Sequence, residues 1–161
     1  PERWPVLPVP ELAKLSAPGR ERASAASSCM LRAGSFGSTT KMSDMRQYLD
    51  FLNRTYPRQA MFITEFGAES NRHGSADEMG TYEFQTNFFA AQLNILRDLP
   101  YMNGIFAWAL RDYWVRPQWT GGNPDPTPPF SRKGLFEVDG SPKPAAALIE
   151  REFKSTPPLK R

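Results

Sequence analysis

The stretch Met61–Ser70 constrains the fold of this chain more than any other part of it. Four apolar or β-branched residues run from Met61 to Thr64, and then come the carboxylate Glu65 and an aromatic–glycine step. A short apolar run closed by glycine predicts a buried strand that ends in a loop. In parallel α/β folds, ligands and catalytic groups gather at the carboxyl ends of the strands. An ionised carboxylate is costly to bury without a partner, so Glu65 is either a structural ion-pair residue or a functional one.

A helix is predicted immediately before this strand. Ser43 suits an N-cap, and four apolar residues from Met45 to Tyr56 recur at spacings of four, three and four, which places them on one helix face. Pro57 ends the pattern, and a short turn leads into a strand at 60–66. A helix, a short loop and a buried strand are the repeating step of a β/α barrel.

A second helix and a second apolar strand follow. The helix is predicted to begin near Tyr82 and to stop before Leu99–Pro100. The continuous apolar run 105–110 is typical of a strand that is covered on both faces, and we expect it to lie parallel to the strand at 60–66. Trp108 lies within this run, where a core position is the ordinary interpretation.

The composition argues against several classes of function. The net charge is +3, and no cluster of five or more Lys and Arg residues occurs, so we expect no nucleic-acid partner. One Cys and one His cannot assemble a zinc-type ligand set, and we expect no metal or other cofactor. No apolar run approaches the ~20 residues of a membrane span, so no membrane partner is expected.

Several short segments resemble a known enzyme family. Ile63–Ala68 resembles the nucleophile strand of retaining glycosidases, most closely those of glycoside hydrolase family 2, which contains β-galactosidases, β-glucuronidases and β-mannosidases. The helix opening Glu83–Gln85, the strand that carries Trp108 and the element Pro142–Ala146 follow in the family's order. The resemblance covers roughly residues 42 to 153, which correspond to the last part of the family's catalytic domain.

The resemblance implies an α/β fold, namely a partial TIM (β/α)8 barrel that holds the last two βα units at 42–155. Residues 1–41 combine prolines with small polar residues and show no periodicity, so we expect a disordered or poorly packed segment there. Residues 156–161 are expected to form a tail. The long loop at 114–133 is predicted to be either a functional lid or disordered.

The resemblance also implies a reaction, the hydrolysis of a β-glycoside by double displacement with Glu65 as the nucleophile. Such enzymes need a second carboxyl group as acid/base. In the family that Glu follows an Asn, and no Asn-Glu dipeptide occurs in this chain. We therefore expect the isolated chain to be inactive. Glu69 lies four residues beyond Glu65 but fits no acid/base motif.

Four further residues are predicted to bind the substrate. The family places a Trp at the floor of the sugar subsite, which Trp108 matches, and Asp112 follows it closely. His73 is the only His and lies in a polar loop, where a solvated role is the alternative. Lys133 matches the Lys of an Asn-x-Lys element that holds the sugar carboxylate in glucuronidases. Ser131 stands at the Asn position, so glucuronide specificity is not implied.

Two other interpretations remain open. One is a glycosidase of a related family, such as the β-glucosidases of family 1. The nucleophile motif of that family is Thr-Glu-Asn-Gly, and here Phe66 stands in place of its Asn. The other is a noncatalytic sugar-binding or interaction module that uses Trp108, Trp114 and Trp119. The chain begins at Pro1 rather than Met, which suggests that the true N-terminus is absent, and no signal-peptide pattern is visible. The resemblance implies a cytoplasmic enzyme whose complete relatives are often oligomeric.

Overall fold

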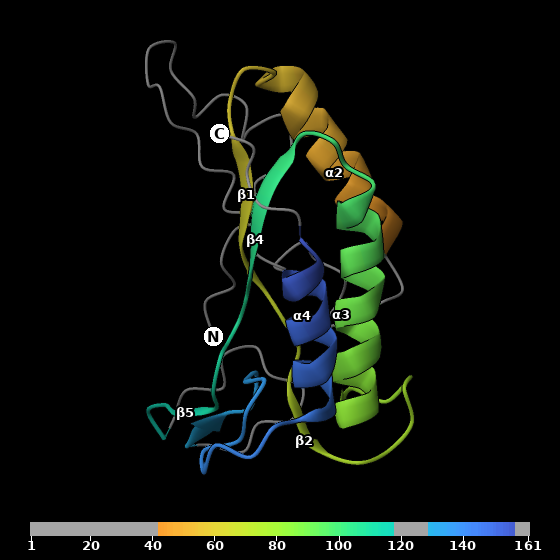
Figure 1. Cartoon of the computed structure of the whole chain (residues 1–161). Coiled ribbons are helices and arrows are strands. Elements are labelled where there is room, and N and C mark those ends of the chain that lie inside the picture. The colour runs from red at the N-terminus through yellow and green to blue at the C-terminus, as the bar shows by residue number, and fades with distance from the viewer. Residues whose placement is uncertain (1–41, 118–128, 157–161) are drawn as a thin grey trace.

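The computed structural model describes residues 42–117 and 129–156 (Figure 1). The expectations for residues 1–41, for most of the 114–133 loop including Trp119, and for residues 157–161 concern segments outside the described residues. The elements are, in chain order, α2 (Met42–Thr55), β1 (Met61–Phe66), β2 (Ser70–Arg72), β3 (Gly80–Thr81), α3 (Tyr82–Arg97), β4 (Met102–Ala107), β5 (Tyr113–Trp114), β6 (Phe130–Ser131) and α4 (Pro144–Ser155). The α/β class expected from the sequence is confirmed.

The strands β1 and β4 pair in parallel, as the two apolar runs predict. Ile63 lies opposite Ile105, and Phe66 lies opposite Ala107. The second strand is shifted from its predicted position: β4 begins at Met102 and ends at Ala107, so Trp108 follows the strand instead of lying inside it. The apolar run continues beyond the strand because apolarity reports burial and does not mark where the pairing ends.

The end of β1 departs from regular alternation. Three steps along β1, from Ile63 to Phe66, face two steps along β4, which is the pattern of a β-bulge. Ile63 and Phe66 are both almost fully buried, with Thr64 and Glu65 between them. In a regular strand Glu65 would share its face with Ile63 and enter the core. The extra residue buries Phe66 instead, and Glu65 remains half-buried.

Three helices cover one side of the strand pair. In Figure 1, α2, α3 and α4 lie together beside β1 and β4. The core contains Leu49 of α2, Ile63 of β1, Phe89 of α3 and Ile149 of α4. Phe89 packs edge-to-face on Phe66, with 5.2 Å between the ring centroids. The helices therefore fix the end of β1 from behind.

The other side of the strand pair exposes apolar side chains in the described structure. Ile105 and Ala107 pack against the core, and alternation places Phe106 between them on the opposite face. Phe106 is 57% exposed and Leu110, just beyond the strand, is 72% exposed. An open face on a parallel pair is unusual, because parallel sheets are normally covered on both sides.

The helix ends follow from their sequences. Thr81 caps α3, because its Oγ1 accepts a hydrogen bond from the backbone N–H of Phe84 at 3.0 Å. Pro144 opens α4 with Lys143 at the N-cap position. No helix within the described ranges is long and apolar enough to cross a membrane.

Candidate active site

Glu65 and Trp108 lie at the same edge of the strand pair. The backbone N–H of Trp108 donates to the carbonyl oxygen of Phe66 at 2.8 Å, so the chain leaves both strands side by side. Gly67 permits this approach, since a Cβ atom there would lie 1.9 Å from the Trp108 carbonyl oxygen. The parallel pairing thus brings residues 65 and 108 to the carboxyl ends of neighbouring strands. The peptide bond between Trp108 and Ala109 is cis.

The Trp108 side chain is partly open. It is 39% exposed, and its ring meets the ring of Tyr113 edge-to-face with 6.0 Å between the centroids. A Trp at a core position would be buried among apolar side chains, and this one is not among the core residues. Its environment suits a ring that offers an apolar surface to a ligand.

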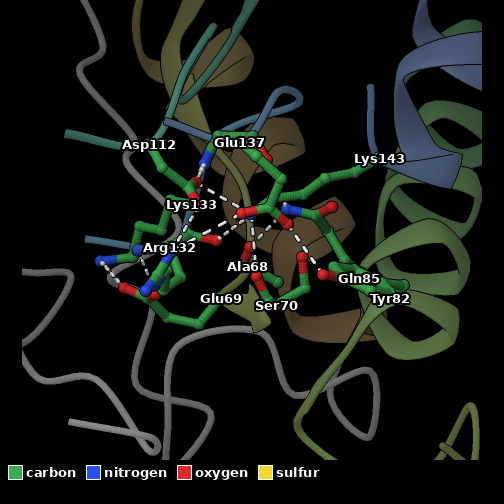
Figure 2. A network of polar contacts seen from close by, with 11 residues as sticks. Ala68, Glu69, Ser70, Tyr82, Gln85, Asp112, Arg132, Lys133, Glu137 and Lys143 are labelled. Carbon is green, nitrogen blue, oxygen red and sulfur yellow. Dashed lines mark hydrogen bonds and ion pairs between the residues drawn. The ribbon is translucent and has the colours of Figure 1, made fainter. Parts of the chain in front are cut away.

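A buried polar network joins the segments that follow the two strands (Figure 2). Its centre is Lys143, whose ammonium donates to the carbonyl oxygens of Ser70 and Arg132 at 2.8 and 2.9 Å and to Asp112 Oδ1 at 2.9 Å. Gln85 of α3 joins the same region by donating to the carbonyl oxygens of Ala68 and Gly134. These contacts join segments that are far apart in the sequence.

Asp112 belongs to this network. It is 3% exposed, and its Oδ1 accepts from the backbone N–H of Gly134 at 2.8 Å as well as from Lys143. Burial raises the pKa of the Asp112 carboxyl, and burial lowers the pKa of the Lys143 ammonium. A Cβ atom at Gly134 would lie 2.2 Å from the backbone nitrogen of Asp112, so glycine is required there. Asp112 was predicted as a sugar contact. Its Oδ1 is hydrogen-bonded within the protein, whereas its buried Oδ2 lies 3.6 Å from the Arg132 guanidinium and has no hydrogen-bond partner among the described residues.

Lys133 and Glu69 form a second buried pair beside the first. Their charged atoms are 3.6 Å apart, and the side chains are 7% and 3% exposed. Glu69 Oε2 also accepts from the backbone N–H of Arg132 at 2.6 Å. Burial raises the pKa of Glu69, although Lys133 opposes the shift. Glu69 therefore holds the loop that carries Lys133, so that loop is anchored close to the end of β1.

His73 lies in the loop after β2 and is exposed. Its Nδ1 is 2.8 Å from Glu83 Oε1, and its ring meets the ring of Tyr82 edge-to-face. Within the described residues it makes no polar contact with Glu65, Trp108, Asp112 or Lys133. The structure brings Glu65 together with Trp108 at the strand ends, and Asp112 together with Lys133 in the buried network.

Sequence reasoning missed the most connected residue of the network. Lys143 and Gln85 appeared only as parts of helix openings, and a buried polar residue leaves no periodic signal. The position of Lys143 just before a helix-opening Pro was the single available hint. Within the described residues no group of three or more His, Cys, Asp and Glu side chains is arranged to hold a metal ion.

Comparisons with known proteins give structural matches. No family model matches the sequence, and no curated protein matches it. Among solved structures, the chain is similar to Bifidobacterium dentium β-glucuronidase complexed with coumarin-3-O-glucuronide, at 23% identity and a TM-score of 0.63 over 74% of this chain. It is similar to a glycoside hydrolase family 2 β-galacturonidase from Eisenbergiella tayi bound to galacturonate, at 22% identity and 0.62 over 71%.

A third match is Ruminococcus gnavus β-glucuronidase in complex with uronic isofagomine, at 19% identity and a TM-score of 0.61 over 73% of this chain. The chain spans only 18%, 22% and 19% of the lengths of these three proteins. At such identities the likeness concerns the fold. The described elements are therefore arranged like one part of these much longer chains.

Proposed function

We propose that this chain supplies the last two βα units of the catalytic barrel of a retaining β-glycosidase of glycoside hydrolase family 2, with Glu65 as the nucleophile. One observation carries the proposal: the parallel pair β1–β4 brings Glu65 and the partly exposed Trp108 to one carboxyl edge. The resemblance of Ile63–Ala68 to the family's nucleophile strand and the fold shared with family 2 uronidases support it. In this proposal β1 and β4 are the seventh and eighth barrel strands.

The chemistry is a double displacement. A Glu65 oxygen attacks the anomeric carbon while the bond to the leaving oxygen breaks, and that oxygen takes a proton from an acid/base group. Water then attacks the anomeric carbon of the glycosyl ester, and the same group removes a proton from that water. The Glu65 carboxylate is restored, and the product sugar keeps its anomeric configuration. Trp108 offers its ring to the apolar face of the sugar.

The acid/base group comes from outside this chain in our proposal. Glu69 is the nearest carboxylate in sequence, but it is buried against Lys133 and the Arg132 amide. A general acid must reach the leaving oxygen. We therefore expect the 161-residue protein alone to release no nitrophenol from nitrophenyl β-glycosides.

The proposed substrate is a β-glycoside, and the proposal does not restrict its sugar to a uronic acid. The three similar proteins are named for glucuronides and galacturonides, and Lys133 is the candidate to meet a sugar carboxylate. Its ammonium already lies 3.6 Å from Glu69, and its side chain is 7% exposed. A neutral sugar is therefore as compatible with the site as an acidic one.

The test joins residues 42–156 to the preceding part of the Bifidobacterium dentium barrel, which supplies an acid/base. A fluorinated dinitrophenyl β-glucuronide or β-glucoside traps the glycosyl-enzyme. We expect peptide mass spectrometry to find the label on Glu65, and to find none in Glu65→Gln. Glu69→Gln, a matched carboxylate change four residues away, should still be labelled. Label on any other residue would contradict the proposal.

A second candidate is a noncatalytic sugar-binding surface, which the exposed aromatic residues favour. Trp114 is 67% exposed and packs on Phe130 with 4.0 Å between the ring centroids, and the Arg132 guanidinium lies 4.6 Å from the same Phe130 ring. This function predicts that Trp114→Ala abolishes sugar binding by the full chain and that Glu65→Gln leaves it unchanged. Nuclear magnetic resonance titration with methyl β-glycosides distinguishes the two functions.

A further inference from the structure

Lys143 occupies the meeting point of three segments. Its side chain is 1% exposed, and its ammonium has three N–H donors. All three have acceptors within 2.9 Å, namely the carbonyl oxygens of Ser70 and Arg132 and Asp112 Oδ1. Its backbone N–H also donates to the carbonyl oxygen of Leu135 at 2.9 Å.

Two of the three acceptors lie just beyond a part of the candidate site. Ser70 lies five residues beyond Glu65, and Asp112 lies four residues beyond Trp108. Arg132 belongs to the segment 131–134, which is hydrogen-bonded to the segment that follows β1 (the exit of β1) and to the segment that follows β4 (the exit of β4). Ser70 N–H donates to the Arg132 carbonyl oxygen, and Ala109 N–H donates to the Lys133 carbonyl oxygen, each at 3.0 Å. Figure 2 shows Ser70, Asp112 and Arg132 gathered around the Lys143 ammonium.

We propose that Lys143 is a positioning residue whose ammonium ties the exit of β1 to the exit of β4 and so fixes Glu65 and Trp108 relative to each other. The inference deepens the proposed function, on which its catalytic consequence rests. Lys143 itself lies behind the edge and touches no substrate in this proposal.

The contacts are more than those of a charge pair. A buried ion pair adds little net stability, because desolvation offsets the attraction, and a neutral pair can often replace it. The carbonyl oxygens of Ser70 and Arg132 carry no net charge to be neutralised. Hydrogen bonds to them are directional and set the places of those two backbone segments. A neutral replacement would keep the core filled but would lose this alignment.

The deciding experiment separates charge balance from positioning in the full chain. Lys143→Met alone removes the hydrogen-bonded cation of the buried Asp112 and leaves only the Arg132 guanidinium, 3.6 Å from Asp112 Oδ2, so it should lower global stability. The double variant Asp112→Asn/Lys143→Met is charge-balanced and keeps an acceptor for the Gly134 N–H. Lys154→Met changes an exposed lysine on α4, the helix that Lys143 precedes as N-cap residue, and is the matched control. Amide hydrogen exchange is measured for Ser70 and Ala109, with amides inside α3 as the reference.

We expect the double variant to recover most of the global stability while the Ser70 and Ala109 amides exchange about tenfold faster, as weakening of their local hydrogen bonds predicts. The α3 amides and the control variant should be unchanged. Unchanged exchange at Ser70 and Ala109 in the double variant would overturn the proposal, because Lys143 would then act only as a counter-ion.

In the barrel chimera the double variant should also slow trapping by the fluorinated glycoside about tenfold or more, since misplacement of a reacting group by about 1 Å is costly. Unchanged trapping together with faster exchange would overturn the catalytic consequence. If the unmodified chimera carries no label on Glu65, the proposed function fails. The exchange result would still decide whether Lys143 holds the two exits.

Discussion

At the scale of single residues, two carboxylates near the candidate site experience opposite environments. Glu69 is buried, and desolvation raises its pKa above the ordinary 4.5. Glu83 is exposed, and hydrogen bonds from His73 and from the Gly74 N–H lower its pKa. A raised folded-state pKa gives a contribution to stability that is complete below pH 4.5 and lost as pH rises through the folded value. A lowered pKa gives a contribution present above pH 4.5 and lost on acidification.

Glu69→Gln should therefore flatten the decline in unfolding free energy above pH 4.5, because it removes a carboxyl whose ionisation opposes folding. Each unit of pKa displacement corresponds to about 1.4 kcal/mol. Urea unfolding at a series of pH values measures the effect. Glu83→Gln is the matched control, and it should alter the curve only on the acid side. Parallel curves for Glu69→Gln and the parent would contradict the assignment.

The residue scale also shows which features of the candidate site the sequence contained. The motif around Glu65 and the position of Trp108 are local features of predicted strands, so the sequence alone made both residues candidates. The partners of Lys143 lie 11, 31 and 73 positions away from it, so no local pattern announces them. Asp112 and Lys133 were found as candidates, but the buried network that occupies them was not predictable.

At the scale of elements, α3 fixes the end of β1 through one aromatic contact. Phe89 is fully buried against Phe66, the residue after Glu65. Phe89→Ala should cost about 3–5 kcal/mol, because the cavity adds to the lost burial. Phe153→Ala on α4, where the side chain is 47% exposed, should change stability by about 0.5 kcal/mol or less. Guanidinium unfolding measures both, and similar losses would show that α3 does not support the edge.

The longer elements were predictable because their apolar residues follow a period. The helices α2 and α3 and the strand β1 appeared close to where the pattern placed them, and β4 pairs with β1 in parallel as expected but lies a few residues earlier than predicted. The bulge at Thr64–Glu65 and the early end of β4 were not predictable, since both depend on the register between strands. The strands β2, β3, β5 and β6 have two or three residues each, which is too short for any alternation.

At the scale of the whole molecule, the described structure leaves one face of the parallel pair open. Phe106 projects there, Leu110 is exposed just beyond β4, and exposed apolar side chains favour association. The full chain should self-associate with rising concentration, and Phe106→Ser/Leu110→Ser should reduce that association without lowering the melting temperature. Sedimentation velocity measures the effect. Phe153→Ser, which removes an exposed apolar side chain from α4, should leave association unchanged, and equal effects of the two changes would contradict a specific face.

The reach of the Lys143 contacts has a consequence for the order in which the protein acquires its structure. The bond from Lys143 to Ser70 spans 73 positions, whereas the helices need only local contacts. On a ribosome the helix–strand unit from α2 to β1 emerges early. The segment that follows β1 lacks its hydrogen bond from Lys143 to the Ser70 carbonyl oxygen until Lys143 has been synthesised. Since contacts of long sequence separation close late, the edge that holds Glu65 and Trp108 is completed last. A nascent chain halted before residue 143 would thus have its core strands and no assembled site.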